Sequence, residues 1–176
     1  GCVWAVKKVC SYCGFYPDGG YRRKSSEVAL QELAWQRETL GWNSFYSLDA
    51  YLPHGLVSGV FRRIPEEQPG ITFPFVELRT RMKRSELELL ARAGVTLVQP
   101  GIECLEDGLL DKILKGVSLA NNLNFLKWSK ELGLEVSWNL LLGLPDATLA
   151  EMERQLEVIE LSPHLAPPSP TRLLFV

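Results

Sequence analysis

The chain has 176 residues, a formal net charge of −2 and a hydrophobic fraction of 46%. This length and composition suit one globular domain with a substantial core, and the charge lacks the basic excess of a protein that binds nucleic acid. No apolar run is long enough to span a membrane and no signal peptide is visible, so we expect neither a membrane nor a nucleic acid among the partners. Cysteines at the spacing of metal ligands fit a reducing, cytoplasmic location better than a disulfide framework.

In chain order, the predicted elements are a turn (16–20), a helix (26–40), a strand (43–48), a short helix (56–63), a strand (71–78), a helix (85–94), a strand (95–98), two helices (109–114 and 119–132), a strand (134–142), a helix (148–161), a proline-rich turn (163–170) and a final strand. Ser25 and Ser26 are suited to cap the first helix and Gly41 to end it. Ser85 and Glu88 have the spacing of a capping box, whereas Pro74 weakens the prediction of strand 71–78.

The alternation of strands and helices predicts a parallel sheet with right-handed crossovers, either an α/β barrel or an open α/β sheet. Neither a G-x-G-x-x-G segment nor a P-loop follows any predicted strand, which argues against a dinucleotide or nucleotide fold. In α/β barrels the functional residues lie at the carboxyl ends of the strands. Those ends carry Asp49, Glu77, Glu103, and Asn139 or Gly143, which predicts a site for a polar cofactor.

Three of the four cysteines lie close together at the start of the chain. Seven residues separate Cys2 from Cys10, and two separate Cys10 from Cys13. Thiolates are soft ligands, and three of them can hold three irons of a 4Fe–4S cluster and leave the fourth iron open to a substrate or cofactor. Structural zinc, with the distant Cys104 as fourth ligand, and reduced structural thiols are the alternatives. Structural zinc requires four ligands and only three are local, which favours the cluster.

The cysteine loop, with Tyr12 before its last cysteine and Gly14 after it, resembles the cluster loop of radical S-adenosylmethionine (SAM) enzymes. The usual first gap in that superfamily is three residues, so the longer gap here is a departure. Segments 101–103, 115–116, 121–128 and 138–145 resemble the radical SAM maturases of ribosomally made peptide natural products, including the cobalamin-associated branch. The resemblance extends over nearly the whole chain, so we expect 1–176 to be one radical SAM core domain.

The resemblance implies a partial (β/α)6, TIM-barrel-like fold that lacks its first strand and is truncated at the C-terminus, as in a fragment. It implies a 4Fe–4S cluster on Cys2, Cys10 and Cys13 and reductive cleavage of SAM to a 5′-deoxyadenosyl radical. The expected partners are a peptide or small-molecule substrate, with methylation among the reactions, and an electron donor such as flavodoxin or ferredoxin. The cobalamin domain of the relatives lies upstream, so cobalamin is expected only for a full-length protein.

The resemblance also assigns SAM-binding positions to Tyr12, Gly14, Asp49, Glu77, Glu103, Lys115, Asn139, Gly143 and Pro145. Tyr12 matches the aromatic position near adenine, and the backbone around Gly143 and Pro145 matches the loop that meets adenine. Glu77 or Glu103 is expected to hold the SAM amino group or the ribose. The residue pattern alone also permits simpler roles for several of these side chains.

In the simpler interpretation, Glu77 pairs with Arg79 or Arg81, Lys115 is a solvated residue at a helix end, and Cys104 is a buried thiol. Asp49 could equally be an ordinary turn residue at the end of a strand. Four tryptophans are expected to pack helices onto the sheet: Trp35, Trp42, Trp128 and Trp138. The alternative function is a zinc-binding or catalytically inactive module.

Overall fold

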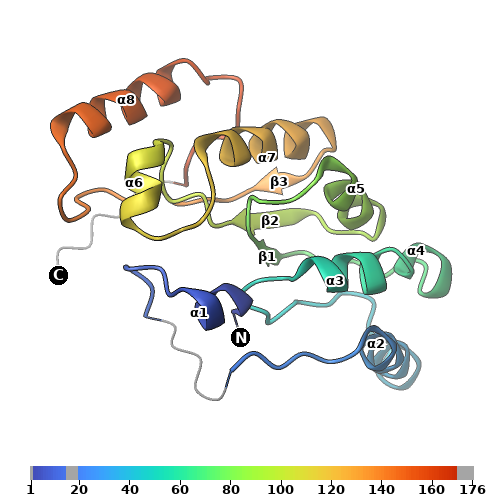
Figure 1. Ribbon diagram of the computed structural model, residues 1–176. Coiled ribbons are helices and arrows are strands. Elements are labelled where there is room, and N and C mark those ends of the chain that lie inside the picture. The colour runs from blue at the N-terminus through green and yellow to red at the C-terminus, as the bar shows by residue number, and fades with distance from the viewer. Residues whose placement is uncertain (1, 15–19, 170–176) are drawn as a thin grey trace.

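A parallel sheet lies at the centre of the computed structural model, which describes residues 2–14 and 20–169 (Figure 1). Its strands β1 (Val76–Leu78), β2 (Leu97–Pro100) and β3 (Glu135–Val136) are adjacent in chain order and all parallel. Isolated parallel bridges extend the pairing, joining Ser44 to Thr72, Phe73 to Val95 and Glu103 to Leu140. Four successive segments of the chain therefore run side by side in sequence order, which confirms the α/β class and the partial barrel.

Helices precede and connect these segments, as the alternating pattern predicts. They are α1 (Val3–Lys7), α2 (Ser26–Leu40), α3 (His54–Leu56), the π-helix η1 (Val57–Phe61), α4 (Ile64–Glu67), α5 (Arg84–Arg92), α6 (Asp107–Lys112), α7 (Leu119–Glu131) and α8 (Leu149–Glu160). Within the described residues, none of these helices is long and apolar enough to cross a membrane.

The helix ends follow local sequence signals, with one correction. Helix α2 has the predicted bounds, and Gly41 ends it in the left-handed conformation, with φ of 70°. The predicted capping box of α5 was wrong. The helix begins at Arg84, and the Lys83 backbone N–H donates to Glu86 Oε2 at 2.8 Å, whereas Glu88 pairs with Arg84 one turn away. Which residues form the capping box depends on the path of the chain into the helix. The spacing of the residues in the sequence does not determine that path.

Three of the predicted strands are shorter in the structure, and the strand predicted at 95–98 is displaced to Leu97–Pro100. The expected strand 71–78 is interrupted at Pro74, because proline lacks the N–H that a sheet ladder requires, and only β1 and the bridges at Thr72 and Phe73 remain. The expected strand 43–48 is reduced to one bridge at Ser44, and strand 134–142 to β3 and a bridge at Leu140. The final strand and most of the turn at 16–20 lie outside the described residues.

The hydrophobic core lies between one face of the sheet and the helices. Its most deeply buried side chains come from η1, β1, α5, β2 and α7: Val57, Val76, Leu87, Leu90, Val98 and Phe125. Side chains alternate between faces along a strand, so Glu77 in β1 and its register partner Gln99 in β2 point away from this core. The sheet therefore has one apolar face under helices and one face that carries polar side chains.

The tryptophans divide into two groups. Trp138 is buried, and Trp128 packs against the core, as expected. Trp35 and Trp42 do not pack a helix onto the sheet, because their exposed fractions are 58% and 55%. The inward side of α2 is formed by Leu30 and Leu33, and the helical period of 3.6 residues directs Trp35 to the other side.

Asn122 in α7 is a fully buried amide that joins three parts of the fold. Its Oδ1 accepts a hydrogen bond from Thr80 Oγ1 at 2.6 Å, just after β1. Its Nδ2 donates to the carbonyls of Ile102 at 3.3 Å and Cys104 at 2.9 Å, after β2. These two carbonyls flank Glu103, whose φ of 63° is in the left-handed region that side chains disfavour. Asn122 therefore holds the strained turn that presents Glu103.

We predict that Asn122→Ala lowers the free energy of unfolding by about 2–4 kcal/mol, because it leaves the Thr80 hydroxyl and the Cys104 carbonyl buried without their hydrogen-bond partner. Chemical denaturation measures this change. Asn124→Ala, at an exposed position of the same helix, is the matched control and should change stability by less than about 0.5 kcal/mol. Equal effects of the two substitutions would contradict the role given to Asn122.

Glu151 ties the start of α8 to α6. Its Oε2 accepts hydrogen bonds from the backbone N–H and the hydroxyl of Thr148, at 2.7 and 2.8 Å, and from Lys112 Nζ. The bond from Lys112, followed by those from Thr148, lowers the pKa of Glu151 from 4.5 to about 2. The charged carboxylate is thus favoured by the folded state.

A carboxyl group whose pKa is lowered by folding contributes stability above its unfolded pKa and loses it as pH falls toward the folded value. We therefore expect Glu151→Gln to destabilise the protein at neutral pH. The difference from the unsubstituted protein should shrink as pH falls from 4.5 to about 2. Urea unfolding across this range measures it, with the exposed Glu153→Gln on the same helix as control. A difference that stays constant with pH would contradict the assignment.

Candidate functional site

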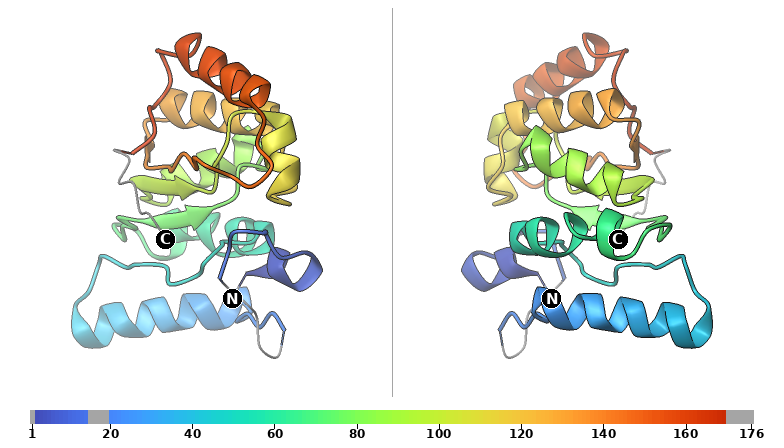
Figure 2. Two further views of the ribbon diagram at one scale, coloured as in Figure 1. Left: turned by 90° about the vertical axis from the view of Figure 1, so that its left-hand side faces the viewer. Right: turned by 90° about the vertical axis from the view of Figure 1, so that its right-hand side faces the viewer.

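The N-terminal cysteine loop docks at the end of the sheet where β2 finishes. Figures 1 and 2 show α1 and α6 together at this end. The backbone N–H of Ser11 donates to the Ile113 carbonyl at 3.1 Å. The Trp4 indole N–H and the Cys10 thiol both donate to the Leu114 carbonyl, at 3.2 and 3.9 Å. The cysteine loop is therefore anchored by hydrogen bonds to the turn after α6.

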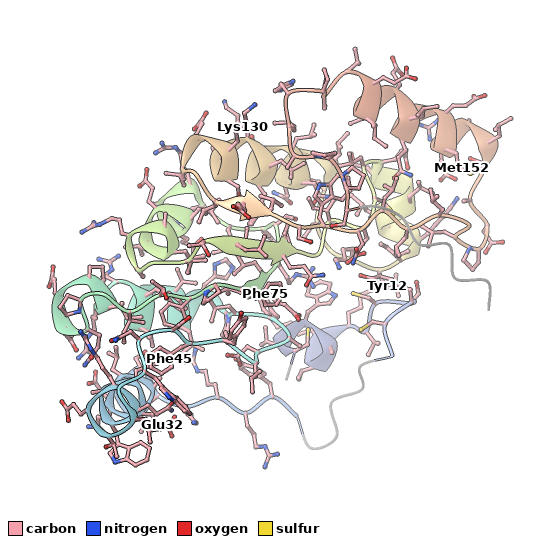
Figure 3. The ribbon with its side chains drawn as sticks, turned by 180° about the vertical axis from the view of Figure 1, so that it is seen from behind. Tyr12, Glu32, Phe45, Phe75, Lys130 and Met152 are labelled. Carbon is pink, nitrogen blue, oxygen red and sulfur yellow. The ribbon has the colours of Figure 1, made fainter. Side chains whose placement is uncertain are left out.

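A buried lysine joins this loop to the end of β2. Lys115 Nζ lies 2.6 Å from Tyr12 Oη and 3.1 Å from Glu103 Oε1. The ammonium group also lies 5.3 Å from the centroid of the Tyr12 ring, and Figure 3 shows Tyr12 on the loop beside α6. The side chains of Lys115 and Glu103 are only 9% and 13% exposed. The structure thus brings together three of the predicted site residues and excludes a solvated role for Lys115.

The backbone around Lys115 and Glu103 is shaped for this contact. A Cβ on Gly101 would lie 2.5 Å from Lys115 Nζ, so a side chain at this position would displace the ammonium group from its present place. Lys115 itself lies between two residues in the left-handed region, Leu114 at φ 56° and Gly116 at φ 66°. This reversal after α6 directs Lys115 back toward the strand end.

The environment of Tyr12 keeps its hydroxyl protonated. Burial is the main reason why the pKa of Tyr12 is raised, and the negative charge of Glu103 raises it further. A neutral hydroxyl can accept a hydrogen bond from Lys115 while its own proton remains available to a second acceptor. Tyr12 therefore contributes both an aromatic ring and a neutral hydroxyl beside the ion pair of Lys115 and Glu103.

The three N-terminal cysteines are free and partly exposed. Burial raises the pKa of the Cys10 thiol, the positive charges of Lys115 and Arg79 lower it, and Cys13 and Cys2 raise it again. Within residues 2–14 and 20–169, no three His, Cys, Asp or Glu side chains are grouped so that they could hold one metal ion. The donor set nevertheless suits an iron–sulfur cluster, in which each thiolate binds a different iron. Assignment of Cys2, Cys10 and Cys13 as ligands stays a prediction.

Cys104 is the buried thiol of the simpler interpretation. It is fully buried and packs with Leu109, Leu110 and Ile113. Burial, followed by the charge of Glu103, raises the pKa of this thiol to about 12, so it is protonated at neutral pH. The structure therefore gives the Cys104 side chain a place in apolar packing, as the simpler interpretation expects.

Among the described residues, no hydrogen bond or ion pair joins the other predicted site residues to the Lys115 side chain. Glu77 is half-buried on the polar face of the sheet, and Arg79 lies against Trp4 rather than in an ion pair with Glu77. Asp49 accepts a hydrogen bond from Ser47 Oγ at 3.1 Å and lines a separate cavity of about 450 Å³ beside α2. Four further predicted residues are exposed on loops: Gly14, Asn139, Gly143 and Pro145.

Trp4 and Arg79 are site residues that the sequence reasoning missed. Arg79 directly follows β1, and its Cζ lies 4.4 Å from the centroid of the Trp4 ring. It also donates a hydrogen bond to the Lys115 carbonyl. The rule that selected Glu77 and Glu103, polar residues at strand ends, would have found Arg79 as well. Nothing in the sequence marks Trp4, because its partners are distant in the chain.

Comparison with known proteins identifies the family of this chain. The model of the radical SAM superfamily matches residues 1–159. No curated protein matches the sequence significantly. Three solved structures with the same fold are the cobalamin-dependent SAM radical enzyme OxsB, the radical SAM methyltransferase TsrM from Kitasatospora setae, and the coproporphyrinogen III oxidase HemN from Escherichia coli.

These structures are similar in fold and distant in sequence. Identities are 19% to OxsB, 18% to TsrM and 19% to HemN, with TM-scores of 0.70, 0.71 and 0.56. The alignments cover 91%, 92% and 89% of this chain but only 25%, 31% and 39% of those chains. The family implies a 4Fe–4S cluster and SAM as cofactors. Because the family model matches most of the chain, residues 1–159, the chain belongs to the radical SAM superfamily.

Proposed function

We propose that the chain is the SAM-binding core domain, over 1–176, of a radical SAM enzyme whose cluster is held by Cys2, Cys10 and Cys13. The observation that carries the proposal is the meeting of Tyr12, Lys115 and Glu103 where the cysteine loop docks on the strand end. When bound, the 4Fe–4S cluster supplies the electron that cleaves SAM to methionine and a 5′-deoxyadenosyl radical.

The ion pair of Lys115 and Glu103 is complementary to the amino acid part of SAM. Lys115 carries the charge to bind a carboxylate, and Glu103 can accept hydrogen bonds from an ammonium group or from a ribose hydroxyl. Both side chains are almost buried, so screening by water is weak and the attraction is strong. Tyr12, Gly143 and Pro145 are assigned to the adenine, with Gly14 beside the cluster.

For the whole protein, we propose methylation of a ribosomally made peptide, with an electron donor such as flavodoxin or ferredoxin. The resemblance of segments 101–103 and 138–145 to peptide maturases supports the substrate class. Similarity in fold to TsrM, a methyltransferase solved with cobalamin and a 4Fe–4S cluster, supports the reaction and the use of cobalamin in the full-length protein. The chain spans a quarter to about a third of the OxsB and TsrM chains, so these activities concern more than this domain.

Anaerobic reconstitution with iron and sulfide tests the cluster. We expect about four irons per chain in the unsubstituted protein and an EPR signal that changes when SAM is added. Replacing Cys2, Cys10 and Cys13 by alanine together should abolish iron binding. Cys104→Ala is the matched control and should retain it, because this thiol lies in an apolar cluster. Retention of zinc, with no iron bound, would overturn the proposal in favour of a zinc-binding module.

The role of Lys115 is tested by Lys115→Met, which keeps the length of the side chain and removes its charge. We expect the cluster content to stay unchanged and SAM affinity to fall by about tenfold or more, which corresponds to ~1.4 kcal/mol. Titration of the SAM-dependent EPR change measures the affinity. Lys127→Met, at an exposed position on α7, is the control. Unchanged SAM affinity in Lys115→Met would contradict the assignment.

A further inference from the structure

The gap of seven residues between Cys2 and Cys10 contains α1 (Figure 1). Trp4 of this helix contacts the turn after α6. Its indole N–H donates to the Leu114 carbonyl at 3.2 Å, across 110 positions of the chain. The same carbonyl accepts the thiol of Cys10 at 3.9 Å. Trp4 and Cys10 therefore share one anchoring point at the turn after α6.

The ring of Trp4 lies directly on the backbone of Gly116. A Cβ on Gly116 would overlap Cη2 and Cζ2 of the ring, so the contact requires glycine for space as well as for its φ of 66°. Gly133 is in the same left-handed conformation, at φ 70°, but a Cβ there would meet nothing within 4 Å. The difference indicates that Gly116 serves the docking of Trp4.

Arg79 is a second residue that packs against the Trp4 ring. Its guanidinium carbon lies 4.4 Å from the ring centroid, within the range of a cation–π interaction. The same guanidinium donates to the carbonyl of Lys115. Arg79 thus connects the end of β1, the Trp4 ring and the residue that binds Glu103 and Tyr12.

We infer that Trp4 is a positioning residue, which latches the long cysteine loop onto Gly116 and Arg79 and so presets Cys10 and Tyr12 beside Lys115. The inference rests on the proposed function, because presetting matters for cofactors bound at that loop. A longer gap between ligands gives the loop more conformational entropy, which is lost when the cluster binds. Contacts that order the loop before the cluster binds reduce this entropy loss. Trp4 contacts Leu114, Gly116 and Arg79 in this arrangement.

The first test compares Gly116→Ala with Gly133→Ala in the full-length protein, before and after cluster reconstitution. Both substitutions place alanine at positive φ, and only the first displaces Trp4. The exposed Lys7 and Lys8 are trypsin sites within the loop. In metal-free protein, we expect cleavage there to be about tenfold faster for Gly116→Ala and within about twofold of unsubstituted protein for Gly133→Ala. Equal cleavage in the two variants would overturn the inference.

The second test substitutes the ring itself. Trp4→Ala should match Gly116→Ala in loop cleavage, and the double variant should show no further increase, because both changes break one contact. Trp4→Phe retains a ring over Gly116 and Arg79 and should restore most of the protection. After reconstitution, Trp4→Ala should lose iron to a chelator faster and broaden the EPR signal, while Trp4→Phe retains both properties. Protection of the loop in Trp4→Ala would overturn the inference.

These readouts separate the two proposals. Loop cleavage in metal-free protein reports the latch whether or not a cluster forms. Failure of the unsubstituted protein to bind iron would overturn the proposed function and leave the cleavage result standing. Normal iron binding together with unchanged cleavage and unchanged chelator sensitivity in Trp4→Ala would instead overturn the latch alone.

Discussion

The ammonium group of Lys115 is the point on which the candidate site depends. It contacts Tyr12 of the cysteine loop and Glu103 of the strand end, so one charge fixes two segments that are far apart in sequence. A buried charge without a partner is costly, and its partners are therefore held in place with it. The absence of a side chain on Gly101 provides the space that this arrangement requires.

The surrounding fold supports the lysine from three directions. Asn122 holds the two carbonyls that flank Glu103, the reversal at Leu114 turns the chain after α6, and Arg79 binds the Lys115 carbonyl. Two non-glycine residues at positive φ lie within this small region, Glu103 and Leu114, each at a cost of about 1–2 kcal/mol. Strain concentrated at a site that tertiary contacts hold together is typical of functional positions. The polar face of the sheet, with Glu77 and Gln99, borders the same end.

Local signals determined much of the secondary structure. Helix α2 begins and ends where its serine cap and Gly41 predict, and the alternation of elements predicted the parallel sheet. The strands were predicted less well, because a strand is defined by its neighbours. Segment 43–48 has the composition of a strand and yet pairs only at Ser44. The misplaced capping box of α5 and the exposed Trp35 have the same origin, since the path of the chain selects the cap and the buried face.

The sequence by itself determined the family resemblance, the α/β class and the candidate ligands, because cysteine spacing, glycine stops and polar residues at strand ends are local properties. Among the predicted site residues, only the tertiary structure decided which ones meet. It joined Tyr12, Glu103 and Lys115, and left Asp49 beside a separate cavity. It also added Trp4 and Arg79, which contact each other although they are far apart in the chain. Contacts between distant residues depend on how the elements pack, and the spacing of residues along the chain does not encode that directly.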